Sequence, residues 1–209
     1  MAQWAKVESG SITGYPSGVK GITIGDNQYP AAIFTVWTEA ERNAIGIYEI
    51  EIDGTNKKDS EYYINTAITY AYDSSANKVK GTYGTATARN LDDTLYTNTD
   101  KSNNLIPEDK DVGDVKYQGL KNSKKEMINT QCANILAPSD WMVVRATETG
   151  TTMDSGWKTW RASVRTKCNS MQTQIDNAAD VDALAALFTY TEQSDKSYTR
   201  PLGQFPVKE

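Results

Sequence analysis

Hydrophobic residues recur at helical spacing in the second half of the chain. Between residues 155 and 177 the larger apolar side chains fall at steps of three and four, with Cys168 beside them: Trp157, Trp160, Val164, Met171 and Ile175. Such a stripe indicates one apolar face of a helix. An earlier stripe from Leu120 to Ile135 predicts a long helix that ends at Pro138. With a shorter helix over 139–149, these segments predict a three-helix unit.

Helix-start signals precede several of these segments. Asp154 or Ser155 can cap the helix that carries the tryptophans, and Asp180 can cap a further short helix, DVDALAALF. Near residue 40 the order Thr-Glu-Ala-Glu has the form of a capping box, and Gly46 follows as a stop signal. One short helix is therefore expected in the first half of the chain.

The first half otherwise follows strand periodicity. Residues 1–36 predict short strands and turns, with a compact apolar run at 33–37. Tyr48, Ile50 and Ile52 alternate with glutamates, which is typical of a half-buried strand. Alternation over 62–72 and 79–85 predicts two more strands. Short polar connections join all three, so we expect an antiparallel meander.

These patterns predict an α+β protein with a small antiparallel β region, a three-helix unit and an extended C-terminal arm. Residues 97–116 are polar and acid-rich, which is typical of a linker. The expected division is therefore an antiparallel β domain with one short helix at 1–96, the linker, a helical domain at 117–188 and the arm at 189–209.

The composition of the chain narrows the range of partners and locations that we expect for it. A net charge of −5 and the lack of long basic runs disfavour nucleic acid as a partner. No stretch approaches the ~20 apolar residues of a membrane span, and the N-terminus lacks the apolar core of a signal peptide. We therefore expect a chain made in a cytosol, with no membrane contact. Its two cysteines, Cys132 and Cys168, are expected to be reduced core residues.

The chemistry of common enzymes is missing from the sequence. There is no histidine, which removes the usual general base and the commonest metal ligand. No nucleophile elbow, phosphate loop or cysteine cluster occurs. The carboxylates gather in polar turns, and 108–114 lacks the spacing of a calcium loop. We therefore expect no catalysis, no cofactor and no metal.

One run in the helical half carries a family resemblance. Ser139-Asp140-Trp141 is followed by Arg145 and Glu148, and then, after a turn, by W-x-x-W-R-x-x-x-R at 157–165. This run resembles the C-terminal module of tailed-phage tail-fibre assembly and tail assembly chaperone-like proteins. Phe205-Pro206 stands where that family often has an aromatic-proline pair, and Trp160 stands where tyrosine is common. The run QYPAAIFTVWTEAERNAIGI at 28–47 is similar to an N-terminal run of phage tail proteins.

The resemblance implies a non-enzymatic, tail-associated virion protein, a fibre or baseplate attachment or assembly component. Its partners would be other phage tail proteins in a symmetric oligomeric assembly, located in the virion tail and, during assembly, in the host cytoplasm. Two alternatives stay open beside it: a tail-fibre assembly chaperone that does not enter the particle, and a carbohydrate-binding receptor module that uses exposed tyrosines. A small glycan-cleaving enzyme ranks last.

Residues from two regions are candidates for partner binding. The helical run contributes three side chains, and the arm contributes isolated apolar anchors in a polar segment. Prolines near these anchors reduce the freedom that docking would remove. The candidates are Trp157, Arg161, Arg165, Tyr190, Tyr198, Leu202 and Phe205. Of the tryptophans, Trp160 is expected in the helical core and Trp157 partly exposed.

Overall fold

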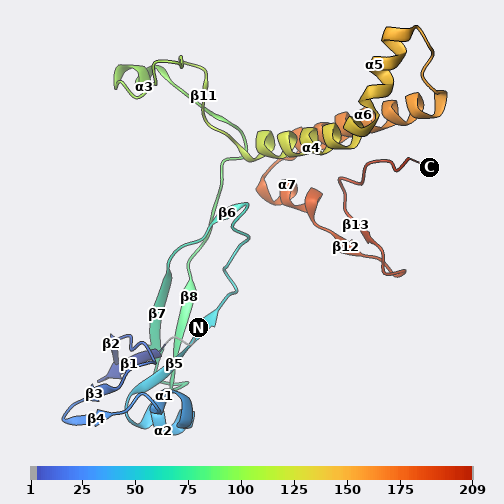
Figure 1. The fold of residues 1–209 in the computed structure, drawn as a ribbon. Coiled ribbons are helices and arrows are strands. Elements are labelled where there is room, and N and C mark those ends of the chain that lie inside the picture. The colour runs from blue at the N-terminus through green and yellow to red at the C-terminus, as the bar shows by residue number, and fades with distance from the viewer. Residues whose placement is uncertain (1–3, 209) are drawn as a thin grey trace. The chain divides into compact units, whose positions relative to one another are not determined.

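A computed structural model describes residues 4–208 of the chain, which folds into two compact units, Met1–Thr87 and Ala88–Glu209. Figure 1 labels the helices and strands of both units. The first unit is built mainly from strands, and the second contains all of the long helices. The predicted α+β class is confirmed.

The main sheet of the first unit has five strands in the order β2-β1-β5-β8-β7. Its strands are β1 (Trp4–Glu8), β2 (Ser11–Gly14), β5 (Ile47–Asp53), β7 (Ile68–Asp73) and β8 (Lys78–Tyr83). A short ladder of β3 (Ile22–Ile24) with β4 (Asn27–Tyr29) accompanies it, and β6 (Tyr63–Ile64) pairs with β9 (Thr87–Ala88). Strand β5 changes partner along its length, because its first residues pair with β1 and its last four with β8.

The predicted antiparallel meander is wrong in its order and in one direction. Strands β7 and β8 form an antiparallel hairpin, but β5 lies next to β8 and runs parallel to it. The expected second strand is also interrupted after Ile64. There the Asn65 side chain bonds to both backbone groups of Lys58, at 2.8 Å each, and the Thr66 hydroxyl accepts from Gly84 N at 2.7 Å. These side chains replace strand pairing at this point, and the chain leaves the sheet.

Two short helices cover part of the first unit. Helix α2 (Glu39–Ala44) begins with the predicted capping box, in which Thr38 and Glu41 bond to each other's backbone N–H. Helix α1 (Ile33–Val36) was missed, because four residues carry too little periodicity to separate a helical turn from a strand. Its Ile33 and Phe34 pack with Trp4 and Ile47 in one buried cluster.

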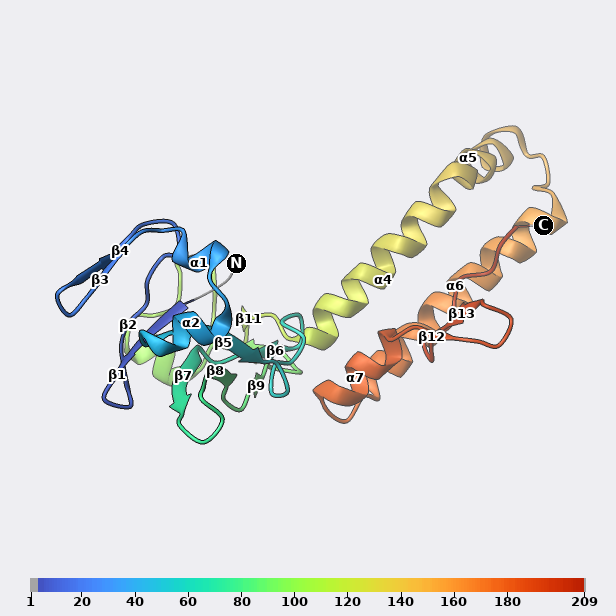
Figure 2. The same cartoon turned by 90° about the horizontal axis from the view of Figure 1, so that it is seen from below.

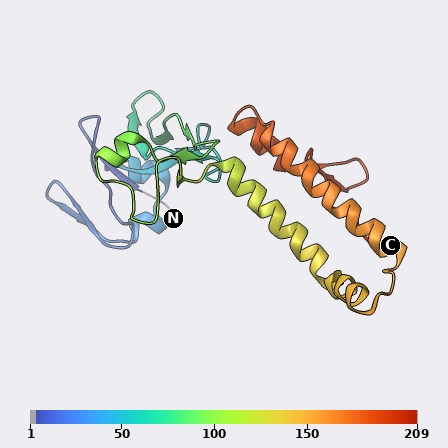
Figure 3. The ribbon, with the colours of Figure 1, turned by 90° about the horizontal axis from the view of Figure 1, so that it is seen from above.

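Four helices organise the second unit. Helix α4 (Leu120–Leu136) ends in a 3-10 turn, η1 (Ala137–Ser139), which leads into α5 (Asp140–Thr149). Then follow α6 (Ser155–Asp176) and α7 (Val181–Phe188), whose N-termini Asp154 and Asp180 cap as predicted. Helices α4 and α6 lie side by side in Figures 2 and 3. Their facing stripes are buried: Lys124, Ile128, Cys132 and Leu136 on α4; Arg161, Val164, Cys168, Met171 and Ile175 on α6.

The expected three-helix unit is therefore a helix pair, and α7 buries Val181 and Leu184. Helix α5 buries none of its residues and does not belong to this core. The cysteines on the facing stripes are both free thiols. Burial, and contact with Cys168, raises the pKa of Cys132 to about 11, so the thiol stays protonated and unreactive at neutral pH. Within residues 4–208, no helix is both long and apolar enough to cross a membrane.

Residues 94–117, which we call the lobe, are structured, so the linker predicted at 97–116 is folded. The short strands β10 (Thr94–Leu95) and β11 (Val115–Tyr117) pair in antiparallel fashion and carry helix α3 (Asn98–Ser102) between them. The base of the lobe is fastened to the start of α4, because Asp93 accepts from Gly119 N and Asn122 Nδ2 at 2.7 and 2.9 Å. A Cβ on Gly119 would lie 2.3 Å from the backbone of Asp92, so only glycine fits there. These contacts place residues 88–96 in the second unit.

One ion pair closes the lobe and gives it a pH response. Lys116 Nζ lies 2.5 Å from Asp100, whose other oxygen accepts from the hydroxyl and N–H of Thr97. These bonds, that of Lys116 first, hold the pKa of Asp100 well below its ordinary value of 3.8. A carboxyl group with a lowered folded pKa stabilises the fold above its unfolded pKa, and this contribution is lost as the pH falls toward the folded value.

We expect acidification below 3.8 to loosen the lobe before the helix pair. The measurement is the loss of lobe amide signals relative to those of α4 and α6 in NMR spectra recorded across the titration. An Asp100→Asn chain should have a loosened lobe already at neutral pH. Asp109→Asn changes an exposed acid of the same lobe and should keep the wild-type response. Simultaneous loss of lobe and helix signals would contradict this expectation.

The arm also differs from the expectation of an extended segment held by another chain. Strands β12 (Thr191–Glu192) and β13 (Tyr198–Thr199) form a hairpin, after which the chain returns to the helices. Leu202 is fully buried, its N–H donates to Leu187 O at 3.1 Å, and Trp160 Nε1 donates to Pro206 O at 3.0 Å. The arm thus completes the core of its own unit.

Candidate functional site

The sequence run that carries the family resemblance has two halves, one at 139–148 and one at 157–165. These two halves meet at one buried arginine. Arg161 on α6 is nearly inaccessible, and its guanidinium reaches the turn between α4 and α5. There it donates to Leu136 O at 2.9 Å and to the Ser139 hydroxyl, and it pairs with Asp140 at 2.6 Å. The planar, multi-donor guanidinium suits this task, because one side chain satisfies three acceptors at once. Arg161 therefore fixes where α5 leaves the helix pair.

Helix α5 exposes large apolar side chains. Trp141, Val143 and Val144 are 54%, 41% and 54% exposed, although their side chains are largely apolar. At 100° per residue, Trp141 and Val144 lie within about 60° of each other, whereas Val143 lies roughly 160° from Trp141. The helix thus presents two apolar sides. We call the side with Trp141 and Val144 the outer face.

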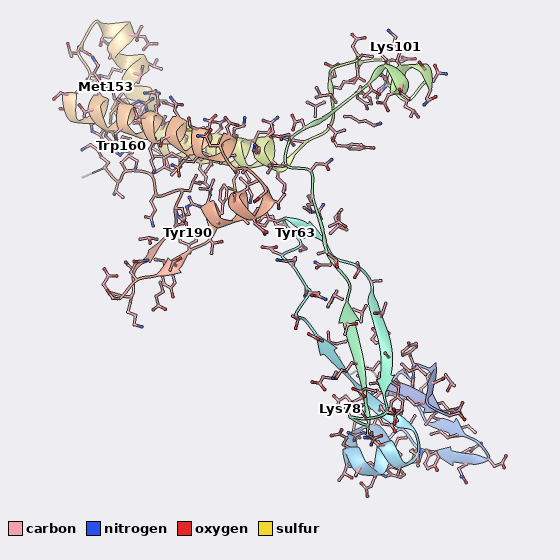
Figure 4. The ribbon with its side chains drawn as sticks, turned by 180° about the vertical axis from the view of Figure 1, so that it is seen from behind. Tyr63, Lys78, Lys101, Met153, Trp160 and Tyr190 are labelled. Carbon is pink, nitrogen blue, oxygen red and sulfur yellow. The ribbon has the colours of Figure 1, made fainter. Side chains whose placement is uncertain are left out.

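The other side of α5 borders a groove toward α6, with a volume of about 390 Å³. Val143, Ala146 and Met153 supply apolar surface, and three basic side chains lie along it. Arg161 is paired with Asp140, but Lys158 and Arg165 are exposed and take part in no ion pair within residues 4–208. The groove is consequently apolar and positively charged. Figure 4 labels Met153 in the connection between the two helices.

Two of the tyrosines predicted to bind a partner lie on the hairpin of the arm. The register pairs Thr191 with Thr199 and Glu192 with Tyr198, so the next pair outward is Tyr190 with Arg200. Opposite residues of an antiparallel pair share a face, and so do residues two apart. Tyr190 and Tyr198 therefore lie on one face, both about half exposed, with the Arg200 guanidinium 5.2 Å from the Tyr190 ring centre.

The tryptophans of α6 pack against the C-terminal segment. Their rings form an edge-to-face pair with centres 5.5 Å apart, and Lys208 Nζ lies 5.3 Å from the Trp157 ring centre. Both side chains are half-buried. The expectation of a core Trp160 is therefore wrong, and the partial exposure of Trp157 is confirmed. Trp160, which is labelled in Figure 4, instead clamps the end of the arm through its bond to Pro206 O.

This clamp predicts a modest, specific effect. Trp160→Phe keeps an aromatic body but removes the indole donor, so we expect a loss of ~1 kcal/mol in unfolding free energy and faster exchange of the Leu202 amide, which bonds to Leu187 O in the same arm. Urea unfolding and hydrogen exchange measure the two effects. Trp157→Phe is the matched control, because the indole N–H of Trp157 donates no hydrogen bond within residues 4–208. Equal effects of both changes would contradict the clamp.

The structure separates the predicted site residues into three groups. Arg161 and Leu202 are covered by their own chain, so they are removed from the candidate docking residues. Tyr190 and Tyr198 share the hairpin face, and Arg165 lies on the groove. Trp157 and Phe205 are half-buried near the end of the chain.

The sequence reasoning missed the outer face, although a signal was present. Residues 141–144 are four consecutive apolar residues and span about 300° of a helix, so they cannot all face one neighbour. Some of these side chains had to remain exposed.

A second hollow, of about 230 Å³, lies in the first unit beside β5. Its polar lining includes Tyr48 and Asn77, whose side-chain oxygen accepts from the hydroxyls of Tyr48 and Tyr72 at 3.0 and 2.9 Å. Burial first, and then the bond with Tyr72, raises the pKa of Tyr48 to about 12, so this hydroxyl remains a neutral donor. The described residues contain no group of three or more side chains suited to hold a metal ion.

No protein-family model matches the chain, and neither a curated protein nor a solved structure matches it. The geometry of the site offers exposed apolar surface on α5 and a charged groove behind it, both suited to binding a protein.

Proposed function

We propose that the chain is a tail-associated protein of a tailed bacteriophage, which binds other tail proteins and carries out no enzymatic turnover. The outer face of α5 is the observation that carries the binding role in this proposal. A helix that buries nothing and exposes a tryptophan beside a valine is typical of a surface that a partner covers.

The phage assignment rests on the sequence resemblance, and the geometry gives that resemblance a physical meaning. Asp140 and Arg161, from the two halves of the run, form the ion pair at the root of α5. Trp141, the next residue of the run, stands exposed on the outer face. The run can thus be understood as the parts needed to hold a docking helix in place.

The test is the presence of the protein in purified phage particles. Quantitative mass spectrometry should find it at a fixed copy number relative to the tail-tube protein. Absence from mature particles, with binding to fibre protein in infected cells, would favour the assembly chaperone instead. Absence of both particle incorporation and fibre binding would overturn the proposal.

A variant pair assigns the binding to the outer face. Trp141→Ala should leave the melting temperature nearly unchanged, because the side chain is exposed, and should strongly reduce incorporation, as interface tryptophans do. Tyr15→Ala removes an aromatic ring of similar exposure from the first unit and serves as the control. Normal incorporation of the Trp141→Ala chain would exclude the outer face as the docking surface.

A further inference from the structure

The lobe has a surface that complements the groove. Leu105, Val112 and Val115 are exposed on it, although they are aliphatic. Residues 108–114, between them, hold four acids and one lysine. Glu108, Asp109 and Asp111 take part in no ion pair within residues 4–208, so the lobe offers apolar side chains flanked by free carboxylates.

The groove has the opposite charge and a similar apolar part. Lys158 and Arg165 border apolar side chains from α5 and from the connection to α6. A binding surface of this kind favours a partner that supplies apolar contacts and negative charge together. Two other acids of the second unit are already paired with basic side chains: Asp140 with Arg161, and Asp176 with Lys125.

A lobe cannot reach the groove of its own chain. Its base is bonded to the first turn of α4, whereas α5 follows the last turn of that helix. The 17 residues of α4 separate these ends by about 25 Å. Figure 4 shows the same arrangement inside the unit, with Lys101 of the lobe and Met153 of the groove at opposite ends of the helix pair.

We propose that the lobe of one copy docks into the α5–α6 groove of a second copy. The contact joins two different surfaces, so it is head-to-tail, and repetition gives a closed ring or an open filament. The inference goes beyond the proposed function, because it concerns copies of this chain alone and leaves the outer face free for another protein.

Two charge-reversal variants of the full chain test the contact. The groove variant carries Lys158→Glu and Arg165→Glu, and the lobe variant carries Asp109→Lys and Asp111→Lys. Sedimentation analysis over a concentration series should show wild-type protein associating beyond the dimer. Each variant alone should associate at least about tenfold more weakly, because like charges now face each other. Added salt should weaken the wild-type contact.

Mixing the two variants gives the decisive result. A groove variant keeps a normal lobe, and a lobe variant keeps a normal groove, so each unlike pair has one native contact. The other contact of the pair joins a reversed lobe to a reversed groove, and these surfaces again have opposite charges. The equimolar mixture should therefore regain association beyond the dimer. Lys20→Glu with Asp26→Lys, in the first unit, is the control and should associate as wild type does.

Three outcomes would overturn the inference: wild-type protein that stays monomeric throughout the series, variants that associate as wild type does, or a mixture that remains monomeric. Melting curves establish that the variants are folded, and neutral versions with Lys158→Gln and Arg165→Gln replace any that are not. Particle incorporation is measured separately, so failure here is distinguishable from failure of the proposed function.

Discussion

Ile47→Ala is expected to lower the unfolding free energy of the first unit by ~2–5 kcal/mol. Ile47 is fully buried on β5 and packs with Trp4, Ile33 and Phe34. Truncation removes apolar burial and leaves a cavity between the sheet and helix α1, which cannot collapse fully because the neighbouring rings are bulky. A loss of this size is a large fraction of the ~5–15 kcal/mol that stabilises a typical domain.

Urea unfolding followed by residue-resolved hydrogen exchange measures this loss and locates it. Ile52→Ala is the matched control on the same strand, because that side chain is 44% exposed and should change stability little. Amides of α4 and α6 should keep their wild-type protection in the Ile47→Ala chain, since the two units are separately compact. Equal loss of protection in both units would show that they unfold as one.

Arg161→Ala is expected to cost the second unit ~2–4 kcal/mol. The change removes hydrogen bonds to Leu136 O, Ser139 and Asp140 and leaves buried polar atoms of the turn with fewer partners. The cost stays below that of a fully buried ion pair, because the Asp140 carboxylate is exposed and water can solvate it. Helix α5 should lose its fixed position, so binding through the outer face should fall as well.

Arg165→Ala provides the control, one helical turn further along α6. That side chain is exposed, so its removal should leave the melting temperature nearly unchanged. Asp140→Asn should cost within about 1 kcal/mol, since it removes only the exposed pair. Thermal melts of the three variants test the ranking. An Arg161→Ala chain that melts like Arg165→Ala would contradict the role of Arg161 at the turn.

Local signals predicted most of the helices. Thr38, Asp154 and Asp180 cap as expected, and α4 ends close before Pro138. These signals act over three or four residues, which is why one sequence suffices to recognise them. The apolar stripes of α4 and α6 were also largely correct, because burial of one helix face leaves its period in the sequence.

The candidate site was predicted less well. Arg161 was expected to bind a partner as one of three side chains of the helical run, yet it lies inside, where acceptors 22 and 25 residues earlier in the chain satisfy it. Leu202 was placed on an arm judged too polar to fold, but one leucine and one proline carbonyl suffice to fasten that arm. Both errors concern partners that lie far away in the sequence.

The sequence by itself therefore determined the α+β class, the starts of helices α2, α6 and α7, the end of α4, and the faces that the long helices bury. Only the tertiary structure decided that β8 lies between β5 and β7, that residues 94–117 form a lobe, and that α5 stands apart with Trp141 exposed. The physical reason is the range of the interactions. Caps and periodicity are settled within one or two turns of chain, whereas strand order, the groove and the turn held by Arg161 depend on contacts between segments that only folding brings together.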